Sequence, residues 1–348
     1  MKAIKMTGPR AAEIQEVPIP ALRDDYVLVK VKAVALNPTD WKHIDFISAT
    51  GCTVGCDYAG IIEEVGPQVT GWKKGDRIAG FTHGSNSIQP EDGCFAEYVV
   101  AKGGIGTRIP PSMTFEDASS LGVGITTVGQ ALYQSLGLPL PESGTNSGLP
   151  ILIYGGSTAT GTIAIQFARL SGCSQIITTC SPANFDLVKS LGATAAFDYR
   201  DPDCASKIRE YTNDALTLAL DCVSDEKSAE ISSNAISSKG GAVCYLLSGR
   251  RHKREDVENK FILAYTAMGE YFEFSIRGKV EYPAQLEDLE FGRKFWQLAE
   301  RLLAEGKVKP HPVEVNLGGG GLEGVFEGLQ AMREGNVSGK KLVYSLEG

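Results

Sequence analysis

Apolar and polar residues alternate along the first third of the chain. In residues 26–36, every second position from Val27 onward is valine or alanine, and this period of two predicts a half-buried strand. Residues 58–66 predict another strand that ends in a glycine turn, and residues 78–79 a short third one. Residues 1–120 are therefore expected to be mostly strands and loops.

The pattern changes at residue 150. Residues 150–154 form a continuous apolar run, which is typical of a parallel strand buried on both faces. Further strands are expected at residues 176–179, 196–198, 216–221 and 242–247, and helices at residues 160–170, 184–191 and 226–237. This alternation predicts a doubly wound parallel sheet.

The segments around this sheet have their own signals. Residues 138–149 are rich in proline, glycine and serine and predict a loop or domain joint. Phe291, Phe295, Leu298 and Leu302 have helical spacing, Gly306 is the expected C-cap, and a turn at 318–321 and a last strand at 342–346 follow.

Composition narrows the class of protein. The 348 residues are 43% hydrophobic and 22% charged, which is ordinary for a globular protein of about two domains. A net charge of −8 excludes bulk attraction to nucleic acid or to an anionic membrane. The sequence shows no signal peptide or apolar run of membrane-spanning length, and its eight cysteines form no CxxC pair. A reducing, cytoplasmic location is expected.

The strongest chemical signal is a glycine-rich turn. Residues 155–161 (GGSTATG) follow the strand at 150–154 and precede a helix, which is the geometry that holds a dinucleotide pyrophosphate. Thr158 departs from the strict glycine pattern, so the serine and threonine hydroxyls are expected to contact phosphate. A plain structural turn is the alternative.

The end of the second strand of this sheet indicates which nucleotide binds. Residues 178–184 contain no carboxylate that would hold a ribose 2′-hydroxyl or repel a 2′-phosphate, whereas Ser181 and Asn184 offer hydrogen-bond donors. Tyr199 is placed to stack on adenine. These features favour NADPH, although Ser181 and Asn184 are also able simply to cap the next helix.

Five motifs occur in a familiar order: residues 36–42 (LNPTDWK), 54–60 (VGCDYAG), 75–77 (GDR), 122–127 (GVGITT) and 338–343 (SGKKLV). Together they resemble the medium-chain dehydrogenase/reductase superfamily over essentially the whole chain. The resemblance implies an α/β protein with a GroES-like, β-rich catalytic domain at residues 1–125 and 285–348. A Rossmann domain that binds NADPH would occupy residues 126–284.

Within that superfamily, residues 154–160, 180–186, 219–222 and 137–141 are similar to the fungal trans-acting enoyl reductases of the lovastatin type, which serve highly reducing polyketide synthases. This similarity implies NADPH-dependent reduction of the α,β-double bond of a polyketide intermediate presented by an acyl-carrier domain of the synthase, in secondary metabolism. A stand-alone quinone or alkenal reductase and a non-catalytic NADPH-binding module are the alternatives. The enoyl-reductase resemblance favours a monomer.

The positions of the zinc ligands in related dehydrogenases carry other residues here. By resemblance, the first ligand position is Asn37, the His-Glu pair is Cys56-Asp57, and the third position is Val123. A zinc-free enzyme is expected, because these side chains do not form a tetrahedral set of zinc ligands. A metal site formed by His43, Cys52 and Cys56 is the weaker alternative.

The motifs and the resemblance together imply the site residues. Lys42 is expected to hold the nicotinamide ribose or to stabilise an enolate, with a surface lysine as the alternative. The cofactor set is Thr39, Asp40, Trp41, Lys42, Ser157, Thr158, Ala159, Thr160, Ser181, Pro182, Ala183, Asn184, Tyr199, Leu246, Leu247, Ser338 and Gly339. The substrate set is Val128, Gly129, Gln130, Ala131, Leu132, Tyr133, Gln134, Ser135, Tyr265, Thr266, Ala267, Met268 and Gly269, and water is the expected proton source.

One basic cluster stands out on this acidic chain. Residues 250–254 (RRHKR) are able to dock an acidic carrier domain and speed the encounter with it. A solvated loop is the alternative, because charge runs usually face water.

Overall fold

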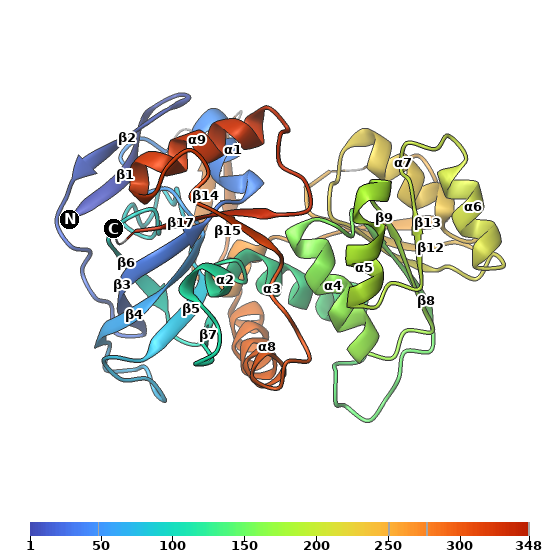
Figure 1. Ribbon diagram of the computed structural model, residues 1–348, viewed down its shortest axis with the longest axis horizontal. Helices are drawn as coiled ribbons and strands as arrows, with labels where there is room; N and C mark the ends of the chain where they lie inside the picture. Colours follow the sequence, from blue (N-terminus) through green and yellow to red (C-terminus); the bar gives the residue numbers. More distant parts are fainter. Residues whose placement is uncertain (48, 250, 276–277, 347–348) are drawn as a thin grey trace. The chain divides into compact units, whose positions relative to one another are not determined.

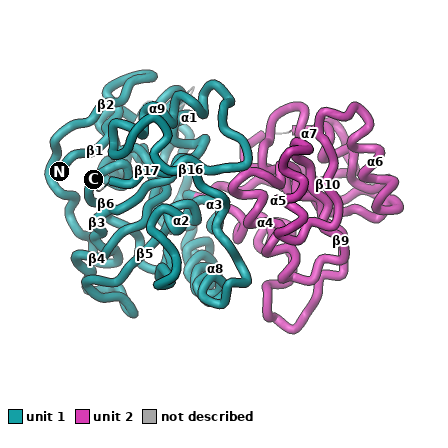
Figure 2. Tube along the Cα trace, viewed as in Figure 1, with its two compact units in different colours: residues 1–126, 265–348 teal, residues 127–264 magenta. Residues whose placement is uncertain are grey.

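The computed structural model describes residues 1–47, 49–249, 251–275 and 278–346. The chain forms two compact units, shown in teal and magenta in Figure 2. Unit 1 comprises residues 1–126 and 265–348, and unit 2 comprises residues 127–264. The chain therefore returns to the first unit at Tyr265, earlier than the expected residue 285.

Unit 1 is built on a mostly antiparallel sheet (Figure 1). Its strands run in the order β16-β17-β3-β4-β5-β7, with β6 also paired to β3. Their bounds are Val313–Val315 (β16), Lys341–Ser345 (β17), Tyr26–Ala35 (β3), Asp57–Val65 (β4), Arg77–Phe81 (β5), Gly106–Arg108 (β7) and Tyr98–Lys102 (β6). Two hairpins complete the strands: β1 (Lys2–Gly8) with β2 (Ala11–Glu16), and β14 (Phe272–Ser275) with β15 (Lys279–Tyr282).

Unit 1 also contains helices, some of which contact this sheet. They are α1 (Pro38–Phe46), α2 (Phe115–Ser119), α3 (Gly122–Gly129, which continues into unit 2), the 3₁₀-helix η3 (Ala264–Met268), α8 (Leu286–Ala304) and α9 (Gly321–Arg333). The predicted late helix is confirmed as α8, where Phe295, Leu298 and Leu302 are buried. Gly306 follows it with a φ of +67°, as expected of a glycine that ends a helix.

Unit 2 is the predicted doubly wound sheet. Its strands are parallel and run in the order β10-β9-β8-β11-β12-β13, the arrangement of a Rossmann domain. Their bounds are Pro150–Tyr154 (β8), Gln175–Thr179 (β9), Ala195–Phe197 (β10), Leu218–Asp221 (β11), Gly241–Tyr245 (β12) and Val257–Phe261 (β13). The helices are η1 (Gln130–Ser135), α4 (Ala159–Leu170), η2 (Pro182–Asn184), α5 (Phe185–Leu191), α6 (Cys204–Tyr211) and α7 (Glu226–Ala235).

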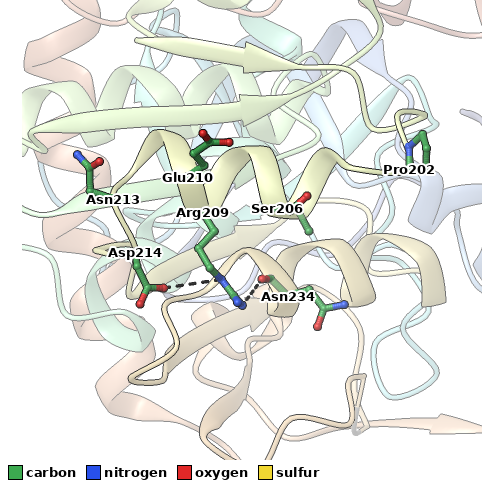
Figure 3. A pocket seen from close by; sticks show the side chains of 8 residues that line it. Pro202, Ser206, Arg209, Glu210, Asn213, Asp214 and Asn234 are labelled. Carbon is green, nitrogen blue, oxygen red and sulfur yellow. Dashed lines mark hydrogen bonds and ion pairs between the residues drawn. The ribbon is translucent and has the colours of Figure 1, made fainter.

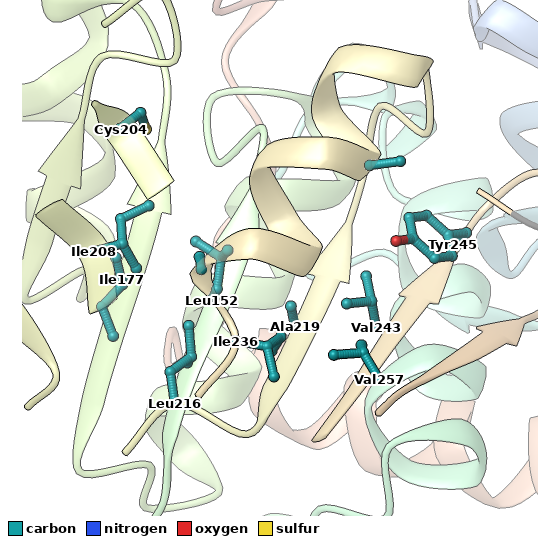
Figure 4. Close-up of a cluster of buried hydrophobic side chains, with 12 residues drawn as sticks. Leu152, Ile177, Cys204, Ile208, Leu216, Ala219, Ile236, Val243, Tyr245 and Val257 are labelled. Atoms are coloured by element: carbon teal, nitrogen blue, oxygen red, sulfur yellow. The ribbon is translucent and has the colours of Figure 1, made fainter. Parts of the chain in front are cut away.

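The core of unit 2 explains the continuous apolar runs in the sequence. Leu152 of β8, Ile177 of β9 and Val243 of β12 are all fully buried, and Ile208 of α6 packs in the same cluster (Figure 4). Since a strand inside such a sheet is covered on both faces, period-two alternation is lost there. Among the helices described, none is both long and apolar enough to cross a lipid bilayer.

Candidate functional site

The carboxyl ends of the central strands of unit 2 meet at one edge of the sheet. Asp221 of β11 is in register with Tyr154 of β8 and Tyr245 of β12, and Tyr154 with Thr179 of β9. The predicted cofactor residues of this unit follow these strand ends directly. The edge of an open α/β sheet where strands end is the usual ligand site of this architecture.

The glycine-rich turn leaves β8 with tight backbone packing. Gly155 has a φ of +77°, which favours glycine. A Cβ at Gly156 would lie 1.9 Å from Thr178 Oγ1, and one at Gly161 would lie 2.3 Å from the carbonyl oxygen of Gly155. Each glycine therefore lets α4 begin close against the sheet, and the turn fits a pyridine-nucleotide pyrophosphate.

Thr158 is the N-cap of α4. Its hydroxyl accepts a hydrogen bond from the Gly161 N–H at 3.0 Å and donates its proton to the Gly155 carbonyl at 2.7 Å. Its single proton is thus committed within the turn. Ser157, Ala159 and Thr160 are each half-buried at this helix start, so the hydroxyls of Ser157 and Thr160 stay the candidates for a phosphate contact.

The segment after β9 contains no carboxylate. Ser181 Oγ accepts a hydrogen bond from Asn184 Nδ2 at 3.1 Å, with Pro182 and Ala183 between them in η2. The two polar side chains are therefore adjacent. Their contact resembles a helix cap and is compatible with binding of a nucleotide by the same residues.

Two cations flank Tyr199, the residue expected to stack on adenine. The Tyr199 ring lies 6.5 Å from that of Tyr154. The Arg200 guanidinium lies 5.6 Å from the Tyr199 ring centroid, and the Lys227 ammonium lies 5.8 Å from it. Sequence reasoning missed both cations. The position of Arg200 next to Tyr199 was an available signal, but Lys227 belongs to α7 and only the fold brings it there.

Leu246 and Leu247 follow β12 at the same edge. The Leu246 N–H donates to Ser224 Oγ at 2.9 Å, and Ser224 in turn donates to the carbonyl oxygen of Asp221. The Leu247 side chain is 38% exposed. Ser224 thus connects the backbone after β12 to the end of β11.

The first expected substrate segment adopts an uncommon backbone. Val128 and Gly129 end α3, and residues 130–135 form a π-helix, η1. Tyr133 is buried and its hydroxyl lies 3.0 Å from Ser171 Oγ, while the Lys260 ammonium donates to the Ser135 carbonyl at 2.8 Å. Short π-helices occur frequently at functional sites, and a binding role for this segment stays a prediction.

The second expected substrate segment lies in unit 1. Tyr265, Thr266, Ala267 and Met268 belong to η3, and Gly269 follows with a φ of +68°. The Tyr265 hydroxyl lies 2.8 Å from Thr39 Oγ1, 3.4 Å from His43 Nε2 and 3.6 Å from Cys56 Sγ. This buried cluster joins the segment to α1.

Helix α1 carries the expected catalytic lysine. Lys42 is half-buried, and its ammonium lies 5.7 Å from the ring centroid of Trp41. Asp40 instead faces inward, with 1% of its surface exposed, and accepts a hydrogen bond from the Asn37 N–H at 2.6 Å. Burial raises the pKa of Asp40 to about 7. The structure therefore gives Asp40 a role in holding the start of α1.

Ser338 and Gly339, the last expected cofactor residues, precede β17. Gly339 has a φ of +66°, and the chain then enters the strand at Lys341. The sequence gives no sign that this lysine belongs to the site. It is buried, and it contacts two of the residues placed at zinc-ligand positions.

The Lys341 ammonium donates to Asn37 Oδ1 at 2.9 Å and also to Asp57 Oδ2. The other carboxylate oxygen, Asp57 Oδ1, accepts the Val123 N–H at 2.6 Å. A cation of the protein itself therefore neutralises the carboxylate here, and the residues present do not fit a zinc ion. Within the described residues, no group of three or more His, Cys, Asp or Glu side chains is arranged to hold a metal.

The basic cluster is largely engaged in local structure, and Arg250 lies outside the described residues. Arg251 donates to the carbonyls of Leu247 and Ser248. Arg254 donates to the carbonyls of Ser233 and Ile236 near the end of α7. These contacts favour a structural role over a free docking surface.

A surface hollow of about 710 Å³ lies along α6 in unit 2 (Figure 3). Arg209 crosses it, pairing with Asp214 at 3.8 Å and donating to the carbonyl of Asn234. The lining residues include none of those expected to bind cofactor or substrate. We therefore assign the hollow no part in the reaction.

Comparison with known proteins identifies the family. The chain matches the alcohol dehydrogenase GroES-like domain over residues 23–111 and the zinc-binding dehydrogenase family over residues 159–270. It is 47% identical over 348 residues to a trans-enoyl reductase of Alternaria alternata and 46% identical over 361 residues to one of Aspergillus sclerotiorum, with 99% of each chain covered in both pairs. An alcohol dehydrogenase superfamily protein from Novosphingobium aromaticivorans shares the fold with a TM-score of 0.82 at 20% identity, covering all of both chains.

The resemblance inferred from the motifs is thereby confirmed. The nucleotide turn and the Rossmann strand order agree with the family matches in identifying an oxidoreductase that uses a pyridine nucleotide. The chain belongs to the fungal trans-enoyl reductases, within the medium-chain dehydrogenase/reductase superfamily.

Proposed function

We propose that this protein uses NADPH to reduce the α,β-double bond of an enoyl thioester carried by a polyketide synthase. The full-length identity to trans-enoyl reductases is the observation that carries this proposal. The partner is an acyl-carrier domain of the synthase, and the enzyme acts as a monomer in the cytoplasm. All eight cysteines are free thiols, which supports a reducing compartment.

The preference for NADPH is supported by the segment after β9. It offers Ser181 and Asn184 but no carboxylate to repel a 2′-phosphate. Lys227 adds positive charge beside Tyr199, whereas the Arg200 guanidinium is paired with Asp198 at 2.9 Å. Phosphate recognition by cations and hydroxyls is the common way to select the phosphorylated nucleotide.

The nicotinamide supplies hydride for the β-carbon of the substrate. Gly156, Gly161 and the start of α4 would hold the pyrophosphate, and Leu246 would line the nicotinamide. Lys42 would hold the ribose through its ammonium. The protein thereby orients the reacting groups, and its π-helix η1 would contact the acyl chain.

The test compares three acceptors with purified enzyme: an enoyl chain on its carrier domain, the same chain as a free small thioester, and a quinone. With the enoyl thioesters, the enzyme is expected to oxidise NADPH, and to do so far faster than it oxidises NADH. With the quinone, no oxidation of NADPH is expected. Faster turnover of the carrier-bound chain supports the synthase partner. Turnover of the quinone alone, or binding of NADPH without turnover of any acceptor, contradicts the proposal.

A further inference from the structure

Two hydroxyls meet in a buried part of unit 1. Thr39 lies in the first turn of α1 and Tyr265 in η3, and their oxygens are 2.8 Å apart. The Tyr265 oxygen also lies 3.6 Å from the sulfur of Cys56, the residue just before β4. Thr39 is one of the residues expected to contact the cofactor, and Tyr265 is one of those expected to contact the substrate. Their hydroxyl contact therefore links an expected cofactor residue to an expected substrate residue.

The Tyr265 ring is held in place by aromatic side chains. It stacks on His83 with ring centroids 4.0 Å apart and an interplanar angle of 20°, and the edges of Phe272 and Phe274 pack against it. Only 6% of Tyr265 is exposed. A phenol fixed in this way loses little conformational freedom when its hydroxyl meets a ligand, which is the requirement for a preorganised donor.

The tyrosine keeps its proton in this environment. Burial raises the pKa of Tyr265 well above its usual value near 10, and the nearby thiol and the Asp40 carboxyl further oppose a negative phenolate. Burial also lowers the pKa of His43 to about 4, so this imidazole is neutral at pH 7. His43 Nδ1 lies 3.3 Å from the Gly84 carbonyl oxygen, and His43 Nε2 lies 3.1 Å from Thr39 Oγ1.

One further donor lies at the same end of α1. The Asn37 Nδ2 amide is buried and has no hydrogen-bond partner within the described chain, while its Oδ1 accepts from Lys341. A buried amide without a partner costs free energy, so this N–H is available to a hydrogen-bond acceptor that enters the site. The missing partner would be a hydrogen-bond acceptor, as a carbonyl oxygen is.

We propose that Tyr265, supported by Thr39, donates a hydrogen bond to the thioester carbonyl oxygen of the substrate and stabilises the enolate oxygen that forms during reduction. The inference rests on the proposed enoyl reduction. Hydride forms the new C–H bond at the β-carbon, the double-bond electrons move into the bond between the α-carbon and the carbonyl carbon, and the carbonyl π electrons move onto oxygen. When the enolate collapses, water supplies the α-proton and Tyr265 retains its own.

The central variant is Tyr265→Phe, which preserves the ring packing and removes only the hydroxyl. We expect kcat to fall about 100-fold, as when one donor to a developing oxyanion is removed, while KM changes less than about threefold. Thr39→Val is expected to lower kcat less, and the double variant is expected to lose less than the product of the two single effects. Tyr271→Phe, which alters an exposed tyrosine bonded to Glu273 and Glu281, is the matched control and is expected to keep wild-type kcat.

Two readouts separate this role from a structural one. A nitroalkene, whose anion is stabilised by its own nitro group, should lose less than about tenfold in Tyr265→Phe. In D₂O, the configuration of deuterium at the α-carbon should be the same in wild type and Tyr265→Phe. A kcat within threefold of wild type on the enoyl thioester, or scrambled α-deuteration that identifies Tyr265 as the proton donor, would overturn the inference.

Failure of the proposed function can be distinguished from failure of the donor role of Tyr265. If wild-type protein reduces no enoyl thioester, the enoyl-reductase assignment is overturned before any variant is compared. If the wild type is active and Tyr265→Phe matches it, only the donor role is lost.

Discussion

The ammonium of Lys341 lies 2.9 Å from Oδ1 of Asn37, although 304 positions separate the two residues in the chain. The same ammonium contacts the Asp57 carboxylate, and the side chains of both partners are almost fully buried. One lysine therefore links the last strand of unit 1 to the N-cap of α1 and to the start of β4. Asn37 and Asp57 are two of the positions that the resemblance places at zinc ligands.

Removing this lysine should destabilise unit 1. Lys341→Met leaves the Asp57 carboxylate buried without its cation, and we expect a loss of about 3–5 kcal/mol in the free energy of unfolding. All three tryptophans, Trp41, Trp72 and Trp296, lie in unit 1, so tryptophan fluorescence during urea unfolding reports on this unit.

The neighbouring Lys340 provides the matched control. Its ammonium pairs with Glu314 at 3.7 Å on the surface, so Lys340→Met should cost less than about 0.5 kcal/mol. Adding Asp57→Asn to Lys341→Met should restore part of the stability by removing the unpaired charge. Equal losses for the two lysine variants would contradict a buried ion pair.

Thr158→Val should weaken nucleotide binding and destabilise unit 2 together. The change removes the cap on the Gly161 N–H and the bond to the Gly155 carbonyl, at a cost of about 1 kcal/mol. A loss of that size in binding raises the Kd for NADPH about fivefold, measured by the fluorescence of the bound nucleotide. Thr158→Ser keeps the hydroxyl and should retain both the stability and the NADPH affinity of the wild type. Equal Kd values for the Thr158→Val and Thr158→Ser variants would exclude a role of the hydroxyl in nucleotide binding.

Lys227→Ala tests the charge beside Tyr199. If this ammonium meets the 2′-phosphate, its removal should raise KM for NADPH about tenfold, equivalent to about 1.4 kcal/mol, and leave KM for NADH unchanged. Lys239→Ala, which alters an exposed lysine in the same unit, should change neither constant. A similar rise with both nucleotides would show that Lys227 does not recognise the phosphate.

His311 should contribute to the pH dependence of stability. Burial, with the charge of Lys341 nearby, lowers its pKa from 6.5 to about 4 in the folded protein. Between these values the unfolded chain binds the proton and the folded chain does not, so stability falls as the pH falls from about 6.5 towards 4. The full contribution is roughly 3 kcal/mol at most.

The measurement is urea unfolding of wild type and His311→Gln from pH 7.5 to 4.5, followed by tryptophan fluorescence. The difference in stability between the two proteins should shrink as the pH falls. A difference that stays constant across this range would show that His311 is not held neutral by the fold.

The elements of unit 2 were predicted more closely than those of unit 1, because the strands of unit 2 are buried on both faces. Parallel strands such as β8 and β9 are covered on both faces, and their apolar runs are visible without knowledge of their neighbours. In unit 1, the Asn37-Pro38 pair directly follows the strand that was predicted at residues 26–36. The structure shows that this pair begins α1, a helix that the alternation did not predict, with proline in the first turn, where its missing N–H costs nothing.

The site was predictable where its residues are close in sequence. The glycine-rich turn and the segment after β9 each lie within one connection of the sheet. The contact of Tyr265 with Thr39 spans 226 positions, and that of Lys341 with Asn37 spans 304. Local patterns contain no information on such pairs, and only the fold brings them together.

Helix α9 is another element that local sequence patterns do not predict. Its sequence, GLEGVFEGLQAMR, has three glycines, which disfavour a helix by about 1 kcal/mol each relative to alanine. Packing explains Gly328, because a Cβ there would lie 2.3 Å from the Tyr344 hydroxyl oxygen and 2.6 Å from Leu36 Cδ1. The close approach of helix and strand outweighs helix propensity at this position.

Gly328→Ala should therefore destabilise unit 1 by about 1–3 kcal/mol, although alanine is the better helix former. Gln330→Ala, on the exposed face of α9, should change stability by less than about 0.5 kcal/mol. Adding Tyr344→Phe removes the nearest oxygen and should recover part of the loss caused by Gly328→Ala. Tryptophan fluorescence during urea unfolding measures all three, and a more stable Gly328→Ala protein would show that α9 and β17 do not approach this closely.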